Sequence, residues 1–225
     1  MRERTSGRRL MLVAAAVGLF ACGHPEQRVV DQYFGAVNAG DNLTLLSFAA
    51  YKFERKAEHW KILSSSEETT AEAPLPGLVK QATDAQAEHD QKKKEMQRFA
   101  NERYNDYVEA QKLLAAGVKI PANLQDMARR LEDWAKTERE LKKRIAEARA
   151  AAEAERKLVQ LSLGADVKDM DTLAADLLSK DLELSVRVGG QEESWMMHLR
   201  RYNPKQTGGP RLISRWIVQA MEPKK

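Results

Sequence analysis

The stretch 78–162 constrains the fold most, because it contains one glycine and one proline, Gly117 and Pro121, close together near its centre. Ala, Glu, Lys, Arg and Gln dominate the rest of the stretch. Glycine and proline are the residues that most disfavour helix interiors, so their absence on both sides predicts two long helices joined by a turn. Long helices that are joined by a short turn pack antiparallel, so the stretch is predicted to be a helical hairpin.

The first helix is predicted to run from 77 or 78 to 116 and the second from 122 or 123 to 163, with the tip near 117–122. At 1.5 Å per residue, each helix is about 60 Å long. In the second helix nine of the eleven heptad positions are apolar, which favours a coiled-coil seam. Its two columns are Leu124, Leu131, Glu138, Ile145, Ala152, Val159 and Met127, Trp134, Leu141, Ala148, Glu155. His89, Lys92 and Arg103 interrupt the stripe of the first helix.

The segments on either side of the hairpin differ from it in composition. They carry most of the tryptophan and alternate apolar with polar residues. The pattern predicts one α+β domain, a small curved antiparallel sheet with N-terminal helices, in two parts at 22–76 and 164–225, interrupted by the hairpin at 77–163.

The expected elements of this domain follow from spacing and turn signals. Val30, Tyr33, Phe34 and Val37 lie on one face of a first helix, and a short second helix follows Gly40. After the hairpin, Gly189-Gly190 predicts a tight turn between two strands. The expected elements are a strand at 58–66, a helix at 170–179 and strands at 182–188, 194–202 and 212–221.

The N-terminal segment 1–21 has the layout of a secretory signal, with a basic start, an apolar run from Leu10 to Ala21 and a small residue before Cys22. The apolar run is shorter than the roughly 20 residues that a spanning helix needs. Cys22 is the only cysteine in the chain. Leu19-Phe20-Ala21-Cys22 resembles the lipobox of bacterial lipoproteins. This resemblance implies lipidation (diacylglycerol and an acyl chain such as palmitate) at Cys22, and a periplasm-facing protein of the bacterial cell envelope.

The net charge depends on that signal. The chain holds 37 Lys and Arg against 33 Asp and Glu, and residues 1–21 account for four Arg and one Glu. The remaining chain has 33 against 32, so its high pI gives no support to nucleic-acid binding.

The flanking segments resemble the nuclear-transport-factor-two-like superfamily. The resemblance rests on Val30-Asp31-Gln32-Tyr33-Phe34-Gly35-Ala36-Val37-Asn38-Ala39-Gly40-Asp41, His59-Trp60-Lys61-Ile62-Leu63-Ser64 and Ser214-Arg215-Trp216-Ile217-Val218. It implies a curved sheet wrapped by helices, a cone with a pocket. This fold carries both enzymes and non-catalytic binding domains. The long hairpin is a departure from the family.

A general acid or base in such a pocket would be Asp31 or His198, and a pocket that binds a ligand would combine Asp31 with Arg215 or His198. His198 alternates with Trp195, Met197 and Leu199, so it points outward if those three face the core. Asp31 has the alternative of an exposed helix residue. The four histidines are scattered and no metal-ligand spacing occurs, so no metal and no cofactor are expected.

The hairpin offers the other candidate site. Trp134 lies in the seam, and an apolar patch at the tip would bind a partner if its residues were exposed: Tyr104, Tyr107, Leu113, Val118 and Ile120. The alternative is that they only close the seam. Likewise Lys92-Lys93-Lys94 is either a solvated face or an anion site.

Three hypotheses about function follow. The first is a non-enzymatic, lipid-anchored envelope protein whose helical arm binds an envelope protein or a second copy. The second is an enzyme or small-ligand binder that uses the cone pocket. The third is an adaptor of the membrane-fusion type, which the tip resembles, although the flanking halves of a lipoyl-like domain are missing.

Overall fold

A computed structural model of the chain describes residues 26–164, 167–205 and 212–224. In these ranges the fold is α+β, as predicted, with five α-helices, two 3₁₀ turns and five strands. The domain elements are α1 (Gln27–Ala39), α2 (Asn42–Phe48), β1 (His59–Ser65), β2 (Thr69–Glu72), η2 (Met170–Thr172), β3 (Ala175–Val188), β4 (Gln191–Pro204) and β5 (Ile217–Pro223). The arm consists of α3 (Leu75–Glu102), α4 (Tyr104–Ala116), η1 (Ala122–Leu124) and α5 (Gln125–Leu163).

The five strands form one antiparallel, unclosed sheet, in which β1, β3, β4 and β5 are neighbours in that order. The short β2 pairs with residues 176–179 of β3, on the same edge of β3 as β1. The long strands β3 and β4 pair from Ala175↔Pro204 to Val188↔Gln191. Gly189 and Gly190 form the turn between them with φ of 58° and 79°. Side chains strongly disfavour these positive φ values, so the Gly-Gly pair determines the hairpin, as predicted.

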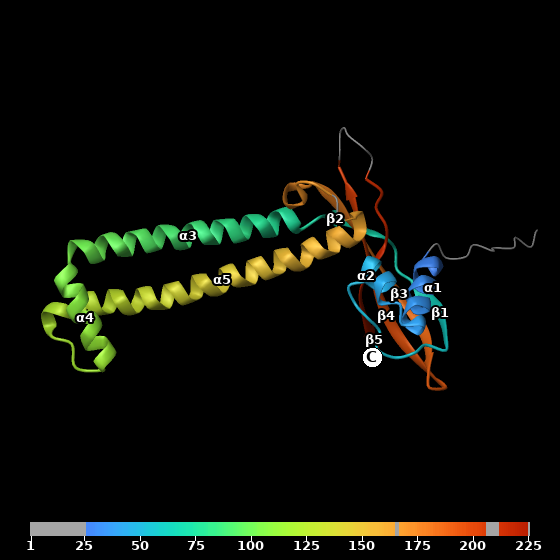
Figure 1. Ribbon diagram of the computed structural model, residues 1–225, viewed down its shortest axis with the longest axis horizontal. Coiled ribbons are helices and arrows are strands. Elements are labelled where there is room, and N and C mark those ends of the chain that lie inside the picture. The colour runs from blue at the N-terminus through green and yellow to red at the C-terminus, as the bar shows by residue number, and fades with distance from the viewer. Residues whose placement is uncertain (1–25, 165–166, 206–211, 225) are drawn as a thin grey trace, which may run out of the picture.

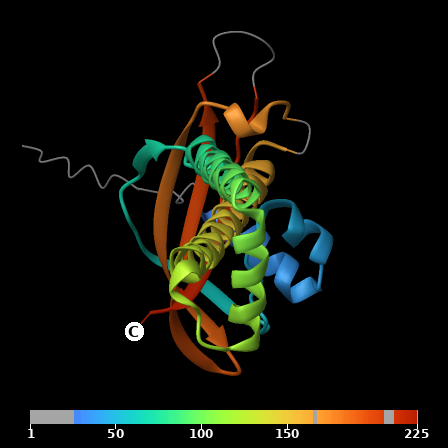
Figure 2. The same ribbon diagram turned by 90° about the vertical axis from the view of Figure 1, so that its left-hand side faces the viewer.

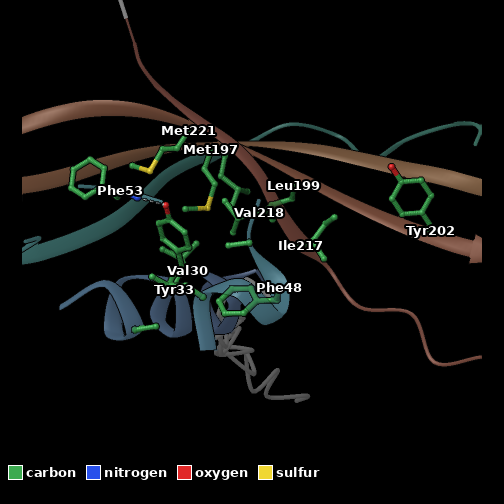
Figure 3. Packing of buried hydrophobic residues seen from close by; sticks show 14 of the residues in the cluster. Val30, Tyr33, Phe48, Phe53, Met197, Leu199, Tyr202, Ile217, Val218 and Met221 are labelled. Atoms are coloured by element: carbon green, nitrogen blue, oxygen red, sulfur yellow. Dashed lines mark hydrogen bonds between the residues drawn. The ribbon is translucent and has the colours of Figure 1, made fainter. Parts of the chain in front are cut away.

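The core lies between the sheet and α1 with α2 (Figure 3). Val30, Tyr33 and Phe34 of α1 are fully buried, and they pack against sheet residues such as Met197 and Leu199. The Tyr33 hydroxyl donates to the Tyr51 carbonyl and accepts a hydrogen bond from the Phe53 amide, so this buried phenol has both partners. The predicted apolar face of α1 is therefore the inner wall of the domain.

The arm leaves the domain between β2 and β3, and α3 and α5 run antiparallel along it (Figure 1). Its base belongs to the domain core: Leu75 of α3 and Ala152, Val159 and Leu163 of α5 are buried in the same cluster as α1. Farther out, the predicted seam holds through Leu141 and Ile145, which are both buried. The arm is thus an outgrowth of the core rather than a separate unit on a linker.

The predicted first helix is broken. Arg103 leaves helical geometry, with φ −127° and ψ 46°, and the chain turns there into α4, which lies across the end of the arm (Figures 1 and 2). No glycine or proline marks the break. Instead, the Arg103 guanidinium pairs with Asp106 at 2.8 Å and with Asp126 of α5 at 3.3 Å. Contacts with α5 therefore compensate for the interrupted helix.

The predicted helix at 170–179 is wrong. Only Met170–Thr172 form a 3₁₀ turn, and Ala175 to Ser179 begin β3. Ala175 and Leu177 are buried between neighbouring strands and the base of the arm, so tertiary packing overrides the helical propensity of the segment. The strand expected at 212–221 is observed only from Ile217 on, and β2 was not predicted.

Candidate functional site: the distal hollow and the root of the arm

The break at Arg103 creates a hollow near the end of the arm, where α3, α4 and α5 separate. Its volume is about 660 Å³. We call it the distal hollow; its lining residues are Lys93, Met96, Gln97, Ala100, Tyr107, Gln111, Leu114, Leu131, Glu132, Trp134, Ala135 and Glu138. Apolar and aromatic side chains from three helices therefore meet amides and charges of both signs. Binding sites in proteins combine these features, and a groove between helices can accept the apolar face of another helix.

A polar corner holds α4 in place beside this hollow. Asp126 pairs with Arg103, with Arg129 at 3.1 Å and with Arg130 at 3.3 Å. Desolvation raises the pKa of Asp126, but the hydrogen bond from Arg129 and the neighbouring arginine charges outweigh it and hold this pKa below its ordinary value. The Arg130 guanidinium also lies 4.4 Å from the ring centroid of Phe99. The Arg103–Asp126 pair and the Arg130–Phe99 contact therefore join the break between α3 and α4 to α5.

The five residues predicted at the tip differ in their exposure. Tyr107 lines the distal hollow, and its hydroxyl accepts a hydrogen bond from Gln111 at 3.1 Å. Tyr104 and Val118 are 64% and 49% exposed, whereas Leu113 and Ile120 are half-buried and are absent from the lining of the hollow. Of these five residues only Tyr107 lines the hollow on the side of the arm, and the tip patch stays a prediction.

Most of the apolar lining was visible in the sequence without being recognised as a site. Met96, Leu114, Leu131 and Trp134 are seam positions, which a straight hairpin would have covered. Because α4 turns away at Arg103, these side chains border a hollow instead of a partner helix. The interruption of the stripe at Arg103 was the one sequence signal of this change.

At the root of the arm, a buried polar network joins α5 to the sheet. The Tyr202 hydroxyl donates to the carboxylate of Glu155 at 2.5 Å, and Arg200 contacts the same carboxylate at 3.3 Å. Burial raises the pKa of Tyr202 well above its ordinary value, and the Glu155 carboxylate raises it further. Glu155 interrupts the predicted apolar seam because its carboxylate accepts hydrogen bonds from Tyr202 and Arg200 of β4.

The last turn of α5 also pairs with the open edge of β4. The Ser162 hydroxyl accepts from the Tyr202 amide at 3.0 Å and donates to the Arg215 carbonyl at 2.9 Å. The Arg215 amide donates in turn to the Ser162 carbonyl at 3.0 Å. The C-terminal end of α5 thus takes the place of a strand beside Tyr202, just before β5 begins at Ile217.

The three residues predicted for a cone pocket lie in separate contact networks. Asp31 accepts from the Trp60 indole at 2.8 Å. The His198 Nδ1 lies 2.7 Å from Asp181, on the face of β4 opposite the buried Met197, so the outward orientation of His198 is confirmed. The Arg215 guanidinium donates to the carbonyls of Leu161 and Ser47. The described contacts do not bring the three together.

Some of the other sequence predictions concern residues that lie outside the described ranges. Cys22, the predicted lipid attachment point, lies outside them together with the predicted signal. Within 26–164, 167–205 and 212–224, no three His, Cys, Asp or Glu side chains are arranged to hold a metal ion. None of the helices in those same ranges is long and apolar enough to cross a membrane.

Comparison with known proteins gives no relative for the chain: no family model, no curated protein and no solved structure matches it.

Proposed function

We propose that this chain is a lipid-anchored protein of the bacterial envelope, attached through Cys22, and that its helical arm binds another protein at the distal hollow. The fold of the domain is proposed to be nuclear-transport-factor-two-like and to serve as a base rather than as a catalytic site. The observation that carries the proposal is the construction of the arm. Its base is part of the core, and its far end holds an apolar hollow lined by three helices.

Rigid attachment supports a role in presentation. The Glu155–Tyr202 hydrogen bond and the Ser162 contacts fix α5 to the sheet, so the arm points in one direction from the domain. Figure 1 shows α4 and α1 at opposite ends of the molecule. A protein held at the membrane near α1 would therefore carry the distal hollow far from its attachment point.

The chemistry of the hollow favours a protein partner. Met96 and Trp134 offer adaptable and aromatic contact area, while Gln97 and Gln111 supply amide donors and acceptors around it. Tryptophan and tyrosine are enriched among the residues that dominate binding energy at protein interfaces. The partner is either another envelope protein or a second copy of this chain.

Photo-crosslinking in intact cells tests this function. A photoreactive residue at Gln111, inside the hollow, should capture a defined partner, and the same residue at the exposed Lys112 of the next position should capture far less. Trp134→Ala should reduce capture at Gln111 by removing the largest side chain of the lining. Equal capture from Gln111 and Lys112, or capture that is insensitive to Trp134→Ala, would contradict the proposal.

The capture product also distinguishes the two kinds of partner. A covalent dimer of this chain, together with a dimer of the purified protein in analytical ultracentrifugation, indicates self-association. A heterologous product together with a purified monomer indicates a separate envelope protein.

A further inference from the structure

A second hollow, of about 290 Å³, lies between the start of α1, the end of α2 and the segment that leads into β5. We call it the arginine hollow, because three of its eight lining residues are arginines. The lining residues are Arg28, Val29, Gln32, Phe48, Arg201, Ser214, Arg215 and Trp216. No carboxylate is among them, so the hollow has a strong positive charge bias.

None of the three arginines forms an ion pair within the described part of the chain. The Arg215 guanidinium donates hydrogen bonds to backbone carbonyls. Arg201 stacks on Trp216 with its guanidinium carbon 4.8 Å from the ring centroid, and its Nε is buried without a hydrogen-bond partner in that same part of the chain. Arg28 is exposed. A buried guanidinium donor without a partner is costly, and an anion in the hollow would remove that cost.

Large exposed apolar side chains occur on two of the segments that line the arginine hollow. Leu43 and Leu46 of α2 are 83% and 70% exposed, and Ile213 is 85% exposed. Leu46 precedes Ser47, whose carbonyl accepts from Arg215, and Ile213 precedes the lining residue Ser214. Cations next to exposed leucine and isoleucine are the composition of a surface that lies on an anionic bilayer.

The position of Cys22 makes the bilayer the relevant source of anions. Three residues lie between Cys22 and Glu26, and a fully extended chain spans at most about 14 Å over these four residue-to-residue steps. Arg28 lies in the first turn of α1. A lipid on Cys22 would therefore hold the arginine hollow within reach of the headgroups.

We infer that the arginine hollow binds the phosphate of an anionic membrane lipid, while Leu43, Leu46 and Ile213 contact the bilayer surface. The guanidinium group suits this role because its planar donors match phosphate oxygens. The membrane placement rests on the proposed function, whereas the headgroup site itself does not require lipidation.

Vesicle flotation with unlipidated protein tests the inference. The probe is the chain 22–225 with Cys22→Ser, mixed with vesicles of phosphatidylcholine alone or with added phosphatidylglycerol. We expect binding to the phosphatidylglycerol vesicles that weakens with salt. Arg28→Gln should weaken it about fivefold, the effect of one cation at a membrane surface. Leu43→Ser with Leu46→Ser should weaken it about tenfold.

Lys136→Gln is the matched control, because Lys136 is also exposed but lies on the arm. It should leave flotation unchanged, and circular dichroism should show all variants folded. No flotation with phosphatidylglycerol, or equal losses from Arg28→Gln and Lys136→Gln, would overturn the inference.

Inorganic phosphate is the second probe of the arginine hollow. If it quenches tryptophan fluorescence through Trp216 while flotation fails, the hollow takes a soluble phosphate and the lipid assignment is wrong. Because the Cys22→Ser protein used in both measurements carries no lipid, their results do not depend on lipidation at Cys22. Lipidation is tested separately, by labelling cells with radioactive palmitate and comparing Cys22→Ser.

Discussion

Replacing Glu155 with alanine should destabilise the whole protein by about 2–4 kcal/mol. The substitution leaves the Tyr202 hydroxyl, which is fully buried, without its acceptor, and such a loss costs about 1–3 kcal/mol. The pair with Arg200 adds about 1 kcal/mol, because the Arg200 side chain is 25% exposed and water screens its charge. Both contacts join α5 to β4, so the cost should fall on the arm and the domain together.

Urea denaturation is the assay, followed by far-ultraviolet circular dichroism for the arm helices and by tryptophan fluorescence for the domain, in a Trp134→Phe background that removes the tryptophan of the arm. Both signals should move to lower urea by the same amount in Glu155→Ala. Glu153→Ala is the matched control, since its ion pair with Arg156 lies at the surface, and it should change stability by less than about 0.5 kcal/mol. Tyr202→Phe combined with Glu155→Ala should cost less than the sum of the single changes.

Two outcomes would refute this reasoning. One is a Glu155→Ala protein whose circular dichroism transition shifts while the fluorescence transition stays in place, since the arm would then be loosely attached. The other is a change no larger than that of Glu153→Ala.

Three further predictions concern single sites. Gly117→Ala should cost about 1 kcal/mol in urea denaturation, because Gly117 ends α4 with φ 66° and a side chain is strained there even in open space. Asp41→Ala should cost about 1 kcal/mol in the same assay, because Asp41 caps α2 by accepting from the Thr44 amide. Burial raises the pKa of Tyr33 and Tyr202 well above the ordinary value near 10.0, so the folded state holds these protons more tightly. Stability should therefore be intact below about pH 10 and fall above it, with two of the five tyrosinate signals appearing only on unfolding.

The second arm helix, two turns and the apolar face of α1 could be predicted because they depend on local sequence signals. The absence of glycine and proline predicted the extent of α5, and Gly117 and Gly189-Gly190 determine two turns through their positive φ values. The apolar spacing of Val30, Tyr33 and Phe34 predicted the face of α1. Each of these signals acts within a few residues of where it is read.

The missed features depend on contacts between distant segments. The break at Arg103 is compensated by Asp126, 23 residues away, and the strand at 175–179 is determined by its neighbours in the sheet. The distal hollow also depends on contacts between distant segments. Trp134 and Tyr107 were singled out in the sequence, but the hollow between them exists only because α4 turns. Arg215 was predicted in a pocket with Asp31 or His198; it lines the arginine hollow, and its guanidinium also connects α5 with α2.

The central claim is that the distal part of the arm binds the partner while its base holds the domain together. A shortened chain tests this most directly, with 87–148 replaced by a short Gly/Ser linker. The Gln86–Arg149 hydrogen bond marks where α3 and α5 face each other, so the cut preserves Ala152, Glu155 and Ser162 at the root.

The measurement is the amount of envelope partner crosslinked to the intact and the shortened chain in cells, with the thermal midpoint of each purified protein beside it. We expect a folded domain with a nearly unchanged midpoint and no captured partner. Undiminished capture by the shortened chain would show that the domain binds the partner, and would contradict the account.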